Sequence, residues 1–223
     1  MTDAPAHGPN DLEVADASGP ANPADDLERR LLDVSELHGD FVLSSGRRSH
    51  VYFDKFRFLA DPSLLREVAG RVRDLLPDGV THLAAPEGAA TLLLSAVALE
   101  AALPMIVVRK EPKAYGTRTQ VEGYPEPGAV VALIEDVSTT GHQVEAAAKA
   151  IERQGCAVAC ILLALDRGGA EVLRTNGYRV ETVVSVSVPA AEPSDAAGPA
   201  AAEAAAAGVA DAAALDGRDE PAG

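Results

Sequence analysis

Two adjacent carboxylates, Glu135 and Asp136, end an apolar run, and after one valine three hydroxyl side chains and a glycine follow. This stretch opens a predicted helix, so its backbone N–H groups and hydroxyls can converge on one anion, and a phosphate uses several donors at once. The acids would repel a phosphate that they faced, so they suit the hydroxyls of an attached sugar, or a Mg²⁺ ion bridged by water. The alternative is an ordinary helix N-terminus with incidental acids. The candidate phosphate ligands are Ser138, Thr139, Thr140 and Gly141.

A second candidate site is a dense cluster of cations in a polar stretch after another predicted strand. Its length, with Gly116 and Gly123, predicts a mobile lid. In a segment that is otherwise nearly neutral, such a cluster suits a polyphosphate, whereas the alternative is a solvated basic loop. The four cations are Arg109, Lys110, Lys113 and Arg118.

Two further strand ends and one N-terminal segment carry groups suited to a ligand. Small residues around Gly88 let backbone N–H groups approach an anion, or simply form a tight turn. Arg167 can pair with a carboxylate or a base carbonyl, or form a surface ion pair. Tyr52 and Phe53 can pack on a planar ligand, but they alternate along a predicted strand, so only one of them can face the site.

These residues need a scaffold, and the apolar periodicity between residues 25 and 188 predicts one. Continuous apolar strands separated by helices predict an α/β fold with a parallel sheet covered on both faces. Ligands of such sheets bind beyond the carboxyl ends of the strands, where the candidate residues lie. The predicted strands are 50–56, 81–86, 104–110, 129–136, 157–166 and 178–188, and the predicted helices are 25–37, 61–76, 88–102, 141–155 and 169–177.

Composition limits the classes of function. The chain has 223 residues and a net charge of −15, of which residues 1–27 and 191–223 carry −6 each. Acidity of this kind disfavours nucleic-acid binding, and both Ala-, Pro- and Gly-rich tails are expected to be disordered. No apolar run is long enough to span a bilayer and no signal peptide is visible, so we expect a cytoplasmic protein. Cys156 and Cys160, four residues apart in a predicted strand, are expected to share one buried face.

Four motifs in this order resemble one known family. The stretches "FVLSSGRRSHVYFD", "VRKEPKAYGTRTQVEG", "ALIEDVSTTG" and "LDRGG" are similar to motifs of the type I phosphoribosyltransferases, and among these of the orotate phosphoribosyltransferases. The resemblance covers roughly residues 35–188. It implies a type I phosphoribosyltransferase-like parallel sheet flanked by helices, in a domain at 25–189 with a small N-terminal hood at about 25–58. Residues 1–24 and 190–223 are then tails.

The resemblance implies transfer of ribose 5-phosphate from phosphoribosyl pyrophosphate (PRPP) to orotate, which gives orotidine 5'-monophosphate and pyrophosphate in de novo pyrimidine biosynthesis. Glu135 and Asp136 would be catalytic residues that hold the ribose hydroxyls. Lys113 would be catalytic and reach the pyrophosphate from the partner subunit of a homodimer with shared active sites. Mg²⁺ would be bound mainly through PRPP and water, with no direct protein ligand. The implied 5-phosphate ligands are Ser138, Thr139, Thr140, Gly141, His142 and Gln143, and the other implied substrate ligands are Arg109, Lys110, Tyr115, Arg167, Tyr52, Phe53 and Ser44.

Two alternatives stay open. The first is transfer to another base, which the orotate-like hood and lid motifs disfavour. The second is a non-catalytic regulator that senses PRPP or a nucleotide. Glu87, an acid in the turn expected to meet pyrophosphate, and His142, in the phosphate loop, motivate this alternative. The basic lid opposes it, because a sensor has no need for Lys113.

Overall fold

The computed structural model describes residues 23–42, 46, 48–112, 119–123 and 125–186. The predicted site residues Ser44, Lys113 and Tyr115 lie outside the described residues, as do the predicted tails apart from the first residues of α1. Within the described part of the chain, no helix is long and apolar enough to cross a membrane.

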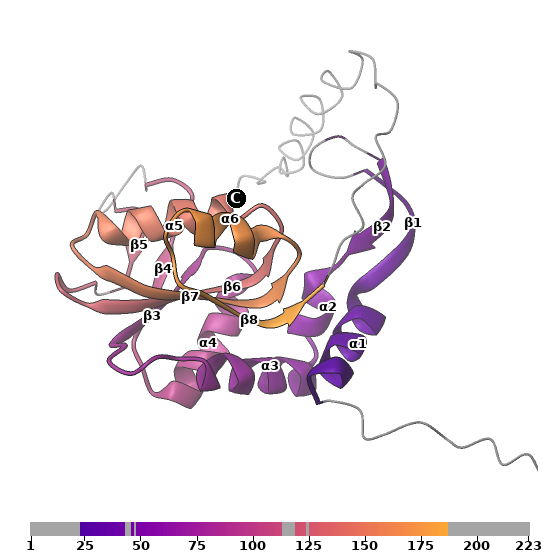
Figure 1. The fold of residues 1–223 in the computed structure, drawn as a ribbon, viewed down its shortest axis with the longest axis horizontal. Helices are drawn as coiled ribbons and strands as arrows, with labels where there is room; N and C mark the ends of the chain where they lie inside the picture. The colour runs from indigo at the N-terminus through magenta and orange to yellow at the C-terminus, as the bar shows by residue number, and fades with distance from the viewer. Residues whose placement is uncertain (1–22, 43–45, 47, 113–118, 124, 187–223) are drawn as a thin grey trace, which may run out of the picture.

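A six-stranded sheet in the order β5-β4-β3-β6-β7-β8 forms the centre of the molecule (Figure 1). Five of its strands are parallel, which confirms the predicted class of fold. The exception is β5, an antiparallel edge strand of two residues in the stretch expected to be only a loop. The strands are β3 (His82–Pro86), β4 (Met105–Val108), β5 (Val121–Glu122), β6 (Val130–Ser138), β7 (Ala157–Asp166) and β8 (Val180–Ser185).

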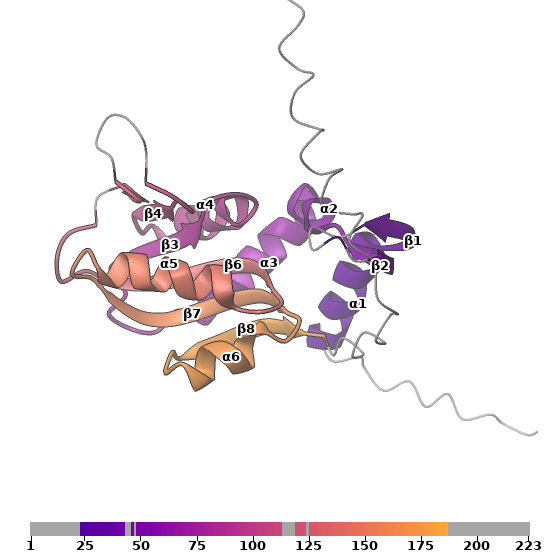
Figure 2. The ribbon, with the colours of Figure 1, turned by 90° about the horizontal axis from the view of Figure 1, so that it is seen from above.

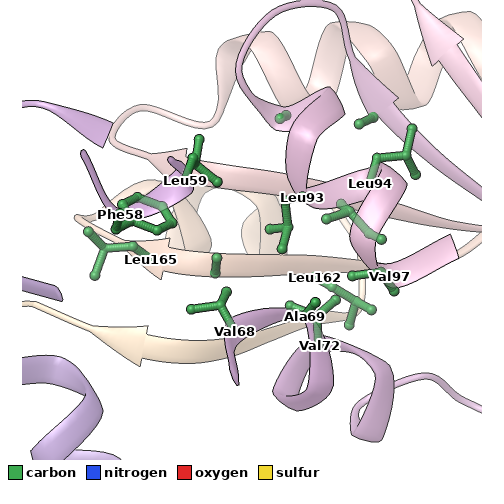
Figure 3. Close-up of a cluster of buried hydrophobic side chains, with 14 of the residues drawn as sticks. Phe58, Leu59, Val68, Ala69, Val72, Leu93, Leu94, Val97, Leu162 and Leu165 are labelled. Atoms are coloured by element: carbon green, nitrogen blue, oxygen red, sulfur yellow. The ribbon is translucent and has the colours of Figure 1, made fainter. Parts of the chain in front are cut away.

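Helices cover both faces of this sheet, as the continuous apolar strands predict (Figures 1 and 2). Helices α3 (Pro62–Asp74) and α4 (Ala90–Ala101) lie on one face, and α5 (His142–Glu152) and α6 (Gly169–Thr175) lie on the other. The core therefore consists of two clusters, one on each side of the sheet. Figure 3 shows the first cluster, in which side chains of α2, α3 and α4 meet the strands.

The predicted hood stands to one side of the sheet (Figure 1). It consists of α1 (Pro23–Ser35), an antiparallel hairpin of β1 (Glu36–Val42) and β2 (Arg48–Phe53), and α2 (Lys55–Leu59). The prediction of one strand over 50–56 was wrong at its end. The Asp54 carboxylate accepts a hydrogen bond from the backbone N–H of Phe56 at 3.1 Å, and this N-cap turns the chain into α2.

The expectation that Cys156 and Cys160 share a face was also wrong. Both are buried, but Cys156 belongs to the cluster under α5 and α6, and Cys160 to the cluster under α3 and α4. Cys156 precedes β7, and the ladder between β6 and β7 shifts register between Val131 and Ala132. Such a bulge changes which residues face each side of the sheet.

Candidate active site

The predicted phosphate loop lies between the end of β6 and the start of α5. Gly141 has a left-handed backbone, with φ of 75°, and it turns the chain into the helix. A Cβ atom at this position would lie 3.0 Å from the carbonyl oxygen of Gly169, so both the conformation and the space favour glycine. The loop encloses a cavity of about 120 Å³, which we call the phosphate-loop cavity. It is lined by Lys55, Glu135, Val137, Ser138, Thr139, Thr140, Gly141, Gln143 and Val144.

The two acids at the end of β6 are both buried, with 4% of Glu135 and none of Asp136 exposed to solvent. Successive side chains of a strand point to opposite faces, and of these two only Glu135 lines the phosphate-loop cavity. Burial and the neighbouring Asp136 carboxylate raise the pKa of Glu135 to about 9, although Lys55 opposes this shift. Glu135 is therefore uncharged near neutral pH, and the repulsion of phosphate expected from paired acids is largely removed.

Lys55 is the functional candidate that the sequence did not reveal. It lies in the first turn of α2, and its Nζ donates a hydrogen bond to Asp136 Oδ1 at 3.2 Å. The same nitrogen lies 3.0 Å from Asp136 Oδ2 without the geometry of a second hydrogen bond. The two residues are 81 positions apart in the sequence, so no local sequence pattern predicts their contact. The one available signal is Asp54, whose capping preference predicts a helix start that places Lys55 beside the hood strand.

The turn after β7 packs directly against the phosphate loop. The backbone N–H of Arg167 donates to the carbonyl oxygen of Ser138 at 2.8 Å. Asp166 Oδ1 accepts from the N–H groups of Gly168 and Ala170, each at 3.0 Å, so this acid caps the turn. A Cβ atom on Gly169 would come within 2.0 Å of Ser138 Oγ. The turn that carries Arg167 and the phosphate loop are therefore one packed unit.

Arg167 also connects this unit to the hood. Its guanidinium carbon lies 5.2 Å from the centre of the Phe53 ring, a cation–π contact. Tyr52, on the other face of β2, packs on Phe41 at 5.4 Å between ring centres and is 42% exposed. Of the two aromatic candidates, Phe53 is the one that contacts a predicted site residue.

A second cavity of about 340 Å³ lies beside the phosphate loop, at the end of β4, and we call it the basic cavity. Arg109 and Lys110 line it, together with the exposed side chain of His142. Gln143 lines both cavities. The residues predicted to bind pyrophosphate and those predicted to bind phosphate therefore lie together beyond the carboxyl ends of the strands. His142 faces the basic cavity. The lining residues are Pro86, Val108, Arg109, Lys110, Gln120, His142, Gln143, Ala146 and Ala147.

Glu87 contacts the first two residues of the basic stretch. Its Oε1 accepts a hydrogen bond from the backbone N–H of Lys110 at 3.0 Å, and its Oε2 lies 3.7 Å from Arg109 Nη1. On the other side, the Gln120 side chain donates to the carbonyl oxygens of Arg109 and Lys110 at 3.1 and 3.3 Å. The acid that looked out of place in the sequence therefore holds the backbone at Lys110 and pairs with the Arg109 side chain.

No family model matches the chain. Comparison with curated proteins gives the orotate phosphoribosyltransferase of Methanopyrus kandleri, which is 40% identical over 162 residues, 71% of this chain and 87% of that protein. The chain belongs to the orotate phosphoribosyltransferase family. Among solved structures, the orotate phosphoribosyltransferase of Aeropyrum pernix is similar with a TM-score of 0.62 and 32% identity, over 73% of this chain and 93% of that one.

A further orotate phosphoribosyltransferase, from Mycobacterium tuberculosis and solved in complex with PRPP, has a TM-score of 0.60 and 25% identity. The similarity covers 73% of this chain and 95% of that one. The sheet and the helices on its two faces are thus those of an orotate phosphoribosyltransferase fold, and family and fold together confirm the resemblance.

Proposed function

We propose that this protein is an orotate phosphoribosyltransferase. The bond from C1 of the PRPP ribose to pyrophosphate breaks, a bond from C1 to N1 of orotate forms, and N1 loses its proton. The observation that carries this proposal is that the phosphate-loop cavity and the basic cavity adjoin at Gln143. A sugar with a phosphate at one end and a pyrophosphate at the other suits that pair of cavities, and family membership favours orotate as the acceptor.

The geometry supports distinct roles for the two cavities. Hydroxyls and backbone N–H groups of Ser138 to Gly141 hold the 5-phosphate, while Glu135, uncharged near neutral pH, meets the ribose hydroxyls without repelling the phosphate. Positive charge develops on the sugar as negative charge develops on the departing pyrophosphate. Arg109 and Lys110 lie where that negative charge appears, so they lower the barrier. Arg167, held against Phe53, orients orotate.

We infer that Mg²⁺ arrives with PRPP. Mg²⁺ prefers oxygen ligands and keeps several waters, so PRPP oxygens and water would supply most of its ligands here. Bound there, the ion would supply further neutralisation of the leaving group. The chain's own contribution is to hold the PRPP oxygens in place through the phosphate loop and the two cations.

We also infer a homodimer. Helix α4 is apolar on nearly all sides, and helices of this kind are normally covered by protein. Leu92 and Leu99 of α4, with Met105 beside it, are nonetheless 45%, 84% and 47% exposed. A second copy covering this face fits the prediction that Lys113 acts from a partner subunit. Light scattering tests it, since a dimer of the 22.9 kDa chain is expected and a monomer would contradict it. The cytoplasmic location and the pathway stay predictions.

The reaction is tested by incubating the purified protein with PRPP and Mg²⁺ and each of several bases, and following the loss of base absorbance. We expect turnover with orotate and formation of orotidine 5'-monophosphate. Turnover with uracil or a purine but not orotate would contradict the assignment of the base. Binding of PRPP without turnover on any base would favour the regulator in place of the enzyme.

A further inference from the structure

Lys55 covers Asp136. The carboxylate has no exposure to solvent, whereas 38% of the Lys55 side chain is exposed above it. A molecule that enters from solvent therefore meets the ammonium group first. Asp136 lies beneath the lysine, on the face of β6 that packs toward α2.

Lys55 also lines the phosphate-loop cavity, although it comes from a different part of the chain than the loop. The other polar groups of that lining are hydroxyls, the Gln143 amide, backbone N–H groups and Glu135. Among the nine residues of this lining, Lys55 is the cation. A phosphate dianion held there would have donors from the loop and a single full positive charge from α2.

The charges around the cavity favour an anion only if Lys55 takes part. Burial keeps Glu135 uncharged near neutral pH, as the rise of its pKa to about 9 indicates. Asp136 and Lys55 form an ion pair across two elements, and a buried carboxylate needs such a partner. The ammonium group has three N–H donors, and its contacts with Asp136 leave others for a ligand.

We propose that Lys55 is a direct ligand of the 5-phosphate of PRPP. Asp136 is then the buried carboxylate that holds the Lys55 ammonium group in the phosphate-loop cavity. This inference rests on the proposed function, because it names a residue of the same substrate site. It assigns Asp136 the role of holding Lys55, in place of the contact with the ribose hydroxyls that the family resemblance implies. The hood then contributes a residue that binds the 5-phosphate.

The test is calorimetric titration of Mg²⁺-PRPP and of Mg²⁺-pyrophosphate into the full chain and its K55M variant. We expect K55M to bind PRPP about 10- to 100-fold more weakly, the usual effect of losing a hydrogen bond from a charged group. Pyrophosphate binding is expected to stay unchanged, because Arg109 and Lys110 provide that contact. K149M, on the exposed face of α5, is the matched control and should bind both ligands like the wild type.

A second comparison separates direct contact from an effect through Asp136. In D136N the carboxylate charge is absent, so K55M/D136N leaves no uncompensated buried charge. This double variant can therefore be tested even if K55M alone folds poorly. If Lys55 touches the ligand, K55M/D136N binds PRPP more weakly than D136N, by a smaller factor than K55M loses relative to the wild type because D136N anchors the ammonium group less firmly. Equal affinities of these two variants, or wild-type affinity in K55M, would overturn the proposal. K55R, which keeps the charge, should recover most of the affinity.

The outcomes also separate this inference from the proposed function. PRPP binding that depends on Lys55 without turnover of orotate would overturn the assigned reaction and leave Lys55 as a ligand. Turnover of orotate with PRPP affinity independent of Lys55 would overturn only the inference. A wild-type chain that does not bind PRPP would overturn both.

Discussion

The phosphate-loop cavity is formed at the buried end of β6, whereas the basic cavity is formed by partly exposed side chains at the end of β4. Glu135, Asp136 and Ser138 are almost completely buried, and the turn after β7 packs against Ser138. Arg109 and Lys110 are held instead by hydrogen bonds between their backbone and the residues Glu87 and Gln120. The first cavity is therefore fixed by the core of the sheet, and the second is positioned by a few polar side chains.

This difference has a chemical counterpart. The 5-phosphate takes no part in the bonds that break and form, so a rigid cavity suits it. The pyrophosphate gains charge and leaves, so its cations need to be positioned but not buried. Substitutions in the first cavity should therefore lower both stability and binding, and substitutions in the second should lower binding alone.

The largest effect is expected from G169A. The added methyl group would come within 2.0 Å of Ser138 Oγ, so the turn after β7 and the phosphate loop have to separate. We expect the free energy of unfolding to fall by about 3 kcal/mol, typical of overpacking in a rigid site, and PRPP binding to be lost. Urea unfolding and calorimetry measure the two effects.

The matched control for G169A is G70A in α3, where the nearest atom to an added Cβ is the Glu100 carboxylate at 3.8 Å. Alanine favours helix over glycine, so G70A should be neutral or stabilising. Normal stability and PRPP affinity in G169A would show that the two loops are not packed as a unit.

A pH-dependent effect of intermediate size is expected at Glu135. Its pKa is near 4.5 when unfolded and about 9 when folded, so between these values the folded state binds more protons. The stability that a protonated Glu135 contributes is therefore complete below about 4.5 and is lost as the pH rises toward 9. The slope for one proton is at most about 1.4 kcal/mol per pH unit.

The E135Q variant cannot lose this proton, so its stability should vary less than that of the wild type between pH 6 and 8. Urea unfolding at several pH values measures the slope. E171Q, at an exposed position of α6, controls for the loss of one acid. Identical slopes in wild type and E135Q would mean that Glu135 is already ionised in the folded protein.

The smallest effect is expected at Glu87, in the second cavity. E87A removes the acceptor of the Lys110 N–H and the partner of Arg109, so pyrophosphate should bind about 5-fold more weakly, the effect of one net hydrogen bond of about 1 kcal/mol. E87Q keeps an acceptor and removes the competing charge, so its affinity should not fall. Calorimetric titration with Mg²⁺-pyrophosphate measures both affinities. Equal losses of affinity in E87A and E87Q would contradict a positioning role of Glu87.

Much of the fold could be predicted from the sequence because its signals are local. Apolar runs and turn residues located the central strands and the helices on both faces. The edge strand β5 was missed because two residues show no periodicity, and the end of β2 was misplaced because Asp54 acts through a cap. The opposite faces of Cys156 and Cys160 depend on a bulge that pairing with β6 creates.

The candidate site could be predicted only where its residues follow strand ends. Glu135, the phosphate loop and the two cations beside it were found in this way. Lys55 was missed because its contact with Asp136 joins α2 to β6 through the tertiary fold. The contacts of Glu87 with Arg109 and Lys110 were missed for the same reason, since they join the turn after β3 to the stretch after β4.

The central claim is that the phosphate-loop cavity and the basic cavity form the two ends of one PRPP site. The direct measurement is a competition titration of the wild-type protein with Mg²⁺-PRPP, ribose 5-phosphate and Mg²⁺-pyrophosphate. We predict that ribose 5-phosphate and pyrophosphate each displace PRPP, and that these two ligands bind together without displacing each other. PRPP binding that neither ligand reduces would contradict the claim.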